Sequence, residues 1–195
     1  MPRPPFPSEL EELFGVSVTE DWPEEFDTPE ESVTDAARWV SPPRLIGALG
    51  EIELIIASGR LLEDVQFLSR NFSCNYLFDS SEHVSGWLLG VRDRIAAATL
   101  ARSTGWPNLL DSARATLETV ALWPPTAEPA SADRALETAT RLGTEAPIEE
   151  VITMLGLVSL MYAALTTTSD ERNWLDTIRT AAATPAAERW PLTST

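Results

Sequence analysis

One stretch of the chain carries no charge over its whole length: VITMLGLVSLMYAALTTTS, residues 151–169. It approaches the roughly 20 apolar residues that a membrane-spanning helix needs. However, a pair of acidic residues borders it on each side, at 149–150 and 170–171, no cluster of positive charge lies beside it, and six of its residues are Ser or Thr. A buried helix explains this pattern better than a membrane span. We therefore expect a central apolar helix over about 147–166, with the rest of the chain folded around it.

Start and stop signals for helices recur along most of the remaining sequence, such as proline at a first helical position and capping boxes. They predict helices over about residues 28–40, 41–70, 81–103, 107–123, 131–143, 147–166 and 168–183. Gly59 is a point where the second of these kinks or splits. No segment alternates apolar and polar residues convincingly with a period of two. The sequence predicts an all-α, single-domain bundle of about seven helices around the central one.

The first 31 residues contain ten acidic residues and one base, Arg3, so they hold −9 of the formal net charge of −16. A short helix is expected there, beginning at Ser8 and ending at Gly15. We divide the chain into an acidic N-terminal arm (1–27), a helical domain (28–184) and a C-terminal tail (185–195). The arm is either docked on the domain or free to meet a partner, and we expect the domain to fold without it.

The composition limits the classes of partner. All 14 basic residues are arginine, against 30 acidic residues, and this usage is typical of a GC-rich bacterial genome. So acidic a chain is repelled by nucleic-acid phosphates and by anionic membranes, so we expect neither as a direct partner. The single cysteine, Cys74, cannot form a disulfide within the chain, and the N-terminus has prolines and acids where a signal peptide needs a basic end and an apolar run. These features favour a cytoplasmic protein.

The composition also limits the chemistry. Without lysine no Schiff base can form on the chain, which excludes pyridoxal phosphate enzymes and lysine aldolases. One His and one Cys cannot supply a zinc or di-iron site, and the Walker and dinucleotide glycine motifs are missing. We therefore expect no metal and no cofactor.

The segment NFSCNYLFDSSEH, residues 71–83, gathers the only Cys and the only His. In one interpretation it is catalytic: Cys74 and His83 form a thiolate–imidazole pair, Asp79 or Glu82 orients the imidazole ring, and Tyr76 acts as a general acid.

In the other interpretation, which we favour, the same segment only begins a helix. Asp79 is then the N-cap and Glu82, three residues later, completes a capping box. Phe78 and His83 pack on each other across that helix end, and no residue is catalytic.

The chain holds seven tryptophans, and most of them are expected near helix ends. Such residues can line the mouth of an apolar pocket, so Trp87, Trp106, Trp123 and Trp174 are candidate ligand-binding residues; alternatively they seal the ends of the core.

Three arginines follow on one predicted helix: Arg92, Arg94 and Arg102. The first two are candidates for binding an anionic ligand, and all three could hold the acidic arm. Ordinary surface pairing with neighbours such as Asp93 is the alternative.

Three functions from different classes remain. The first is a binding protein that holds an apolar small molecule in an aromatic-lined pocket or engages a basic protein surface. The second is a cofactor-independent enzyme of the cyclase or isomerase type, as found in bacterial secondary metabolism. The third is an acidic mimic of nucleic acid, which needs acids in rows over one face, whereas more than half of the net charge lies in the terminal segment. A homo-oligomer is compatible with each of them.

Overall fold

The computed structural model describes residues 9–17, 22–60, 80–102, 108–123, 128–165 and 169–190. These ranges contain helices and turns and no strand, which confirms the expected all-α fold. The helices are α1 (Glu9–Ser17), α2 (Trp22–Glu25), α3 (Pro29–Ala37), α4 (Pro42–Ser58), α6 (Ser81–Ala101), α7 (Leu109–Thr119), α8 (Pro129–Glu145), α9 (Ile148–Ala164) and α10 (Ser169–Ala187).

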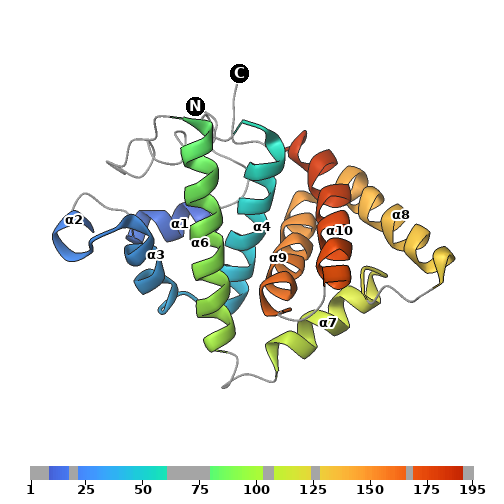
Figure 1. Ribbon diagram of the computed structural model, residues 1–195, viewed down its shortest axis with the longest axis horizontal. Coiled ribbons are helices and arrows are strands. Elements are labelled where there is room, and N and C mark those ends of the chain that lie inside the picture. Colours follow the sequence, from blue (N-terminus) through green and yellow to red (C-terminus); the bar gives the residue numbers. More distant parts are fainter. Residues whose placement is uncertain are drawn as a thin grey trace.

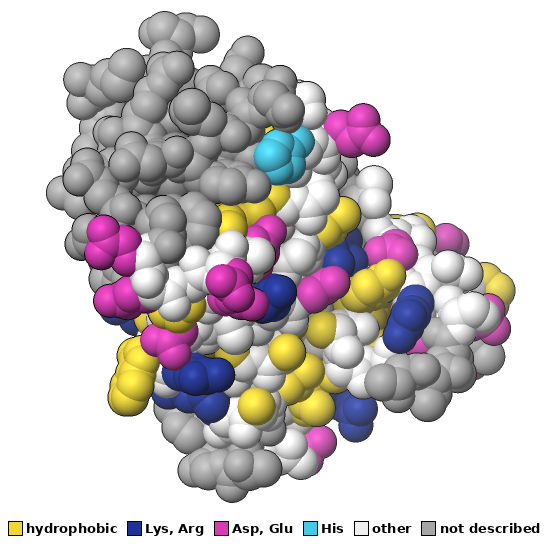
Figure 2. Space-filling model, turned by 60° about the vertical axis from the view of Figure 1, so that its left-hand side comes forward, with side chains coloured by type: hydrophobic (Ala, Val, Ile, Leu, Met, Phe, Trp, Pro, Cys, Tyr) yellow, Lys and Arg dark blue, Asp and Glu magenta, His cyan; other side chains and the backbone are white. Residues whose placement is uncertain are grey.

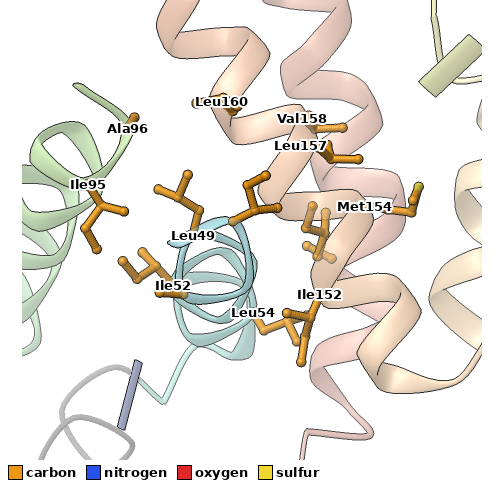
Figure 3. Packing of buried hydrophobic residues seen from close by; sticks show 14 of the residues in the cluster. Leu49, Ile52, Leu54, Ile95, Ala96, Ile152, Met154, Leu157, Val158 and Leu160 are labelled. Carbon is orange, nitrogen blue, oxygen red and sulfur yellow. The ribbon is translucent and has the colours of Figure 1, made fainter. Parts of the chain in front are cut away.

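Two helices, α4 and α9, pack against each other at the centre of the bundle (Figure 1). The apolar run is buried as expected: α9 is covered almost continuously from Val151 to Met161. Helix α4 is also buried along most of its length, and its side chains extend both ways. Ile52 lies on the side of α4 that faces Ile95 of α6, while Leu54 lies on the side that faces Ile152 of α9 (Figure 3). The core is therefore built on a pair of helices.

The other helices cover this pair from two sides. Helices α1, α3 and α6 lie on the α4 side, while α7, α8 and α10 lie on the α9 side (Figure 1). Helix α10 contacts both α4 and α9, so it closes one face of the central pair. This arrangement brings α4, α6 and α10 to the same part of the surface.

Helix α1 is docked on the bundle. Leu10, Leu13 and Phe14 are buried in the same core as the side chains of α3 and α4. The helix also runs through Gly15, the expected stop, to Ser17. Of the two alternatives for the acidic arm, docked or free, residues 9–17 are docked.

Charged contacts fix α1 on α4. The buried carboxylate of Glu51 accepts hydrogen bonds from the backbone N–H groups of Glu9 (3.0 Å) and Leu10 (2.8 Å) in the first turn of α1. These N–H groups have no partner within a helix, and a negative charge is stabilised at that end. On the surface, Arg44 pairs with Glu9 at 2.5 Å and with Glu12.

The end of α4 confirms one expectation, and the start of α6 corrects another. Helix α4 ends at Ser58, at the split expected at Gly59, which adopts a left-handed conformation with φ of 69°. The N-cap of α6 is Ser80 and not Asp79: the Ser80 hydroxyl accepts the N–H of His83 at 3.2 Å. Ser and Asp cap helices about equally well, so two adjacent candidates cannot be ranked from sequence.

Helices α8 and α10 both continue through residues expected to stop them. A Cβ on Gly143 would lie 2.5 Å from the carbonyl oxygen of Ala182, so this glycine allows close packing of α8 on α10 and does not end α8. Pro185 lies near the end of α10, which continues to Ala187. Beyond it, Arg189 donates to the carbonyl oxygens of Gly143 (2.6 Å) and Ala146 (2.7 Å), which satisfies the end of α8.

Candidate functional site

A buried ion pair joins α4 to α10. Glu53 and Arg179 are only 6% and 8% exposed. Arg179 Nε donates to Glu53 Oε2 at 3.1 Å, and Nη2 donates to Oε1. Ser159 of α9 donates its hydroxyl to the same Oε1 at 2.9 Å. One carboxylate therefore links the three helices that meet at this face.

The guanidinium of Arg179 has two further neighbours. Nη1 donates to Asp176 Oδ1 at 3.1 Å, and the carbon Cζ lies 4.7 Å from the centre of the Tyr162 ring. Burial acts to lower the pKa of Arg179, but the attraction and hydrogen bonds of Glu53, followed by those of Asp176, outweigh it and raise the pKa above its ordinary value. A base stays protonated until the pH exceeds its pKa, so Arg179 is charged at every ordinary pH. The stability that its charge contributes is therefore lost only at very high pH.

A pocket of about 240 Å³ opens beside this ion pair, between α4, α6 and α10. Its lining combines charged, hydroxyl and apolar side chains: Glu53, Ile56, Ala57, Leu89, Arg92, Asp176, Arg179, Thr180, Ala183 and Thr184. We call it the α4–α6–α10 pocket. Sequence reasoning selected only Arg92 among these residues.

Arg92 and Asp176 are the two charged groups lining this pocket that each have a nitrogen or oxygen atom without a hydrogen-bond partner among the described residues. Arg92 bonds Asp93 Oδ1 through Nε (3.1 Å) and Nη2 (2.9 Å), and its Nη1 has no partner among the described residues. Asp176 uses Oδ1 for Arg179, and its Oδ2 likewise has no partner there. The Arg92 side chain is 15% exposed and that of Asp176 54%. A ligand could therefore meet one free donor group and one free acceptor oxygen.

A larger pocket, of about 510 Å³, lies between α7, α8 and the start of α9. Its charged side chains include Arg134, Arg141 and Glu150, which are exposed or nearly so. It reaches no buried charge, whereas the α4–α6–α10 pocket is lined by two. Buried charged groups in a cleft are typical of functional sites, so we select the smaller pocket as the candidate site.

The candidate catalytic residues are only partly described. Cys74, Tyr76 and Asp79 lie outside the described residues. Glu82 and His83 lie in the first turn of α6, and both are exposed. The favoured capping box is wrong in its residues, because Ser80 is the N-cap and His83, not Glu82, lies three residues after it. The catalytic pair stays untested.

The candidate tryptophans lie apart. Trp87 of α6 is buried against Phe14, with ring centres 5.2 Å apart. Trp123 is buried after α7, under the guanidinium of Arg114 at 5.8 Å, and Trp174 is partly buried on α10. Trp106 lies outside the described residues. No described tryptophan lines the α4–α6–α10 pocket or the larger one.

The candidate arginines divide between two tasks. Arg92 lines the pocket and pairs with Asp93, the neighbour expected from the sequence. Arg94 donates to the Thr34 hydroxyl at 3.3 Å, and Arg102 donates to the carbonyl oxygens of Ala37 and Val40 at the end of α3. Arg94 and Arg102 therefore hold α3 on α6.

The surface mixes the two signs of charge. In Figure 2, acidic side chains lie among arginine and hydrophobic side chains, and the described part of this face carries no continuous row of acids. Trp39, at the turn after α3, is 83% exposed, far more than any other large apolar side chain of the described residues.

Comparison with protein-family models, with curated proteins and with solved structures finds no match for this chain. Among the helices whose residues are described, none has the length and apolar character that would let it cross a membrane. In the same residues, no group of three or more His, Cys, Asp or Glu side chains is placed to hold a metal ion.

Proposed function

We propose that this protein is a binding protein that holds a small polar organic molecule in the α4–α6–α10 pocket. The observation that carries the proposal is the buried Glu53–Arg179 pair in the wall of that pocket. Replacing a buried ion pair by apolar residues is often neutral or stabilising, so core stability alone is a weak reason for this one. A pocket that needs polar groups in fixed positions is a better reason.

The lining supports a polar ligand with an apolar part. Ile56, Leu89 and Ala183 give an apolar surface. Arg92 adds an unused hydrogen-bond donor, and Asp176 adds an unused acceptor oxygen. The volume of about 240 Å³ is below the roughly 300–1,000 Å³ of pockets for drug-sized ligands. The proposal keeps the binding protein expected from the sequence but replaces the apolar ligand in an aromatic pocket by a small polar one.

Two matched variants on α10 test the proposal. Thr180 lines the pocket and Thr177 does not, although both are exposed and each donates its hydroxyl to a carbonyl oxygen one turn earlier. Thr180→Trp should fill the pocket, and Thr177→Trp should leave it open.

A library of small polar metabolites would be screened by saturation-transfer NMR against the wild type and both variants. We expect compounds that bind the wild type and Thr177→Trp and fail to bind Thr180→Trp. Absence of any bound compound, or equal binding to all three proteins, would contradict the proposal.

A second candidate function is engagement of a basic protein segment, and the exposure of Trp39 favours it. Residues 22–40 hold six acidic residues and one base, Arg38. An exposed indole attracts arginine and lysine through its ring face, and the nearby carboxylates attract the same cations.

Fluorescence anisotropy with a labelled arginine-rich peptide tests this candidate. Trp39→Ala should weaken binding by about tenfold, the equivalent of one well-placed aromatic contact. Thr140→Ala, at an exposed position of the distant α8, should bind as the wild type does. Equal affinity of the wild type and Trp39→Ala would contradict this candidate, because it would show that net charge alone attracts the peptide.

A further inference from the structure

We infer that the ligand of the α4–α6–α10 pocket is a zwitterion of amino-acid size, with its carboxylate on Arg92 and its ammonium group on Asp176. This inference rests on the proposed function and adds the chemical class of the ligand. It follows from which atoms of the charged groups in the pocket are already used.

Arg92 has one edge of its guanidinium free. Asp93 occupies the edge made by Nε and Nη2, since both donate to its Oδ1. The other edge, made by Nη1 and the second hydrogen of Nη2, matches the two oxygens of a carboxylate in the bidentate geometry that arginine prefers. Because the side chain is only 15% exposed, water competes weakly for this edge.

Asp176 supplies the opposite sign. Its Oδ1 is taken by Arg179, and Oδ2 has no partner among the described residues. An ammonium group carries three donors and suits such an oxygen. Arg179 already has two carboxylate partners, because Glu53 accepts from its Nε and Nη2 and Asp176 accepts from its Nη1, whereas Arg92 has one. The free donor and the free acceptor therefore belong to Arg92 and Asp176.

The charge balance of the lining also favours a zwitterion. Glu53 and Asp176 contribute two negative charges, and Arg92 and Arg179 contribute two positive charges. Glu53 and Arg179 bind each other, so Arg92 and Asp176 offer a ligand one contact for each sign of charge, and a zwitterion can use both. The volume of about 240 Å³ lies below that of pockets for drug-sized ligands, as a ligand of amino-acid size requires. This leaves room for a small aliphatic side chain against Leu89 and Ile56.

Four compounds of similar size separate the possible ligand classes in calorimetric titrations. L-valine is an α-zwitterion and 5-aminopentanoate is a zwitterion with its charges far apart. The compounds 3-methylbutanoate and isobutylamine each keep one charged group of valine. We expect one of the two zwitterions to bind at least about tenfold more tightly than either singly charged compound, since each charged group adds a charge-assisted hydrogen bond.

Variants identify the groups that bind. Arg92→Met and Asp176→Asn should each weaken binding of the preferred zwitterion by about tenfold or more. Arg94→Met on the same helix α6, and Asp170→Asn in the first turn of α10, lie outside the pocket lining and should bind as the wild type does. Melting temperatures measured for all four variants show whether each remains folded.

The outcomes distinguish this inference from the proposed function. If 3-methylbutanoate or isobutylamine binds as tightly as both zwitterions, the site is specific for a single charge and the zwitterion is refuted, while the pocket remains a binding site. The zwitterion is also refuted, and the pocket remains a binding site, if none of the four compounds binds but another small molecule binds the wild type and fails to bind Thr180→Trp. If no small molecule binds the pocket at all, both fail.

Discussion

Gly50 of α4 lies so close to Ile152 of α9 that a Cβ atom on the glycine would stand 1.8 Å from the carbonyl oxygen of the isoleucine. The relationship is repeated in reverse four residues away, where a Cβ on Gly156 would stand 1.9 Å from the carbonyl oxygen of Ile46. The central helices are therefore antiparallel at this crossing, and their backbones touch because each offers a glycine to the other.

This crossing predicts the cost of a single methyl group. Gly50→Ala should destabilise the protein by about 1–3 kcal/mol or more, because the helices must move apart in a packed core. Gly86→Ala, on the exposed face of α6 with no heavy atom within 4 Å, should instead stabilise it by about 0.5–1 kcal/mol, since alanine favours helix. Chemical denaturation of both variants measures the difference. A Gly50→Ala protein as stable as wild type would show that α4 and α9 do not cross here.

The apolar run of α9 predicts a matched pair of variants. Leu155 is buried, so Leu155→Ala should lower the free energy of unfolding by about 2–5 kcal/mol. Thr153, two residues before it, is exposed, and Thr153→Ala should change the free energy by less than about 0.5 kcal/mol. Equal effects of the two substitutions would mean that α9 is not enclosed by the other helices.

The buried ion pair predicts a strongly non-additive double variant. Glu53→Leu or Arg179→Met alone leaves a charge without its main partner and should cost about 3–5 kcal/mol. The double variant removes both charges and should recover most of that loss. Urea denaturation gives the three free energies. Additive losses would show that the two side chains do not act as a pair.

Removal of residues 1–17 tests whether α1 belongs to the domain. The helix buries Leu10, Leu13 and Phe14, and each such side chain contributes roughly 1.5–3 kcal/mol when buried. We expect a clearly lower melting temperature and a less cooperative transition. A truncated protein that melts like the full chain would support the separable arm expected from the sequence.

The fold class could be predicted because its signals are local. Each of them can be read within a short stretch of sequence: the uncharged run of α9, the prolines at first helical positions, and the absence of alternation with a period of two. The errors arose where contacts over long distances override local signals. Gly143 has the features of a helix stop, but it stays helical because α10 packs directly against it.

The candidate site could not be predicted for the same physical reason. Glu53 lies in the sequence EIELII, in which two acidic residues interrupt an apolar run. This pattern indicates carboxylates that are buried with the run and therefore need partners. The partner of Glu53 is 126 residues away, and no local pattern connects the two. Arg92 was selected as part of an arginine series, but Asp176 of α10 carried no such signal.

The α4–α6–α10 binding site is tested most directly by a methyl NMR titration of the full chain with the tightest binder of the four-compound series. Ile56 and Leu89 line the α4–α6–α10 pocket, and Leu142 lines the larger pocket between α7 and α8. We predict saturable shifts of the Ile56 and Leu89 methyl signals, an unchanged Leu142 signal, and loss of the shifts in Thr180→Trp. Shifts of Leu142 instead, or no saturable shift at Ile56 and Leu89, would contradict the assignment of the binding site.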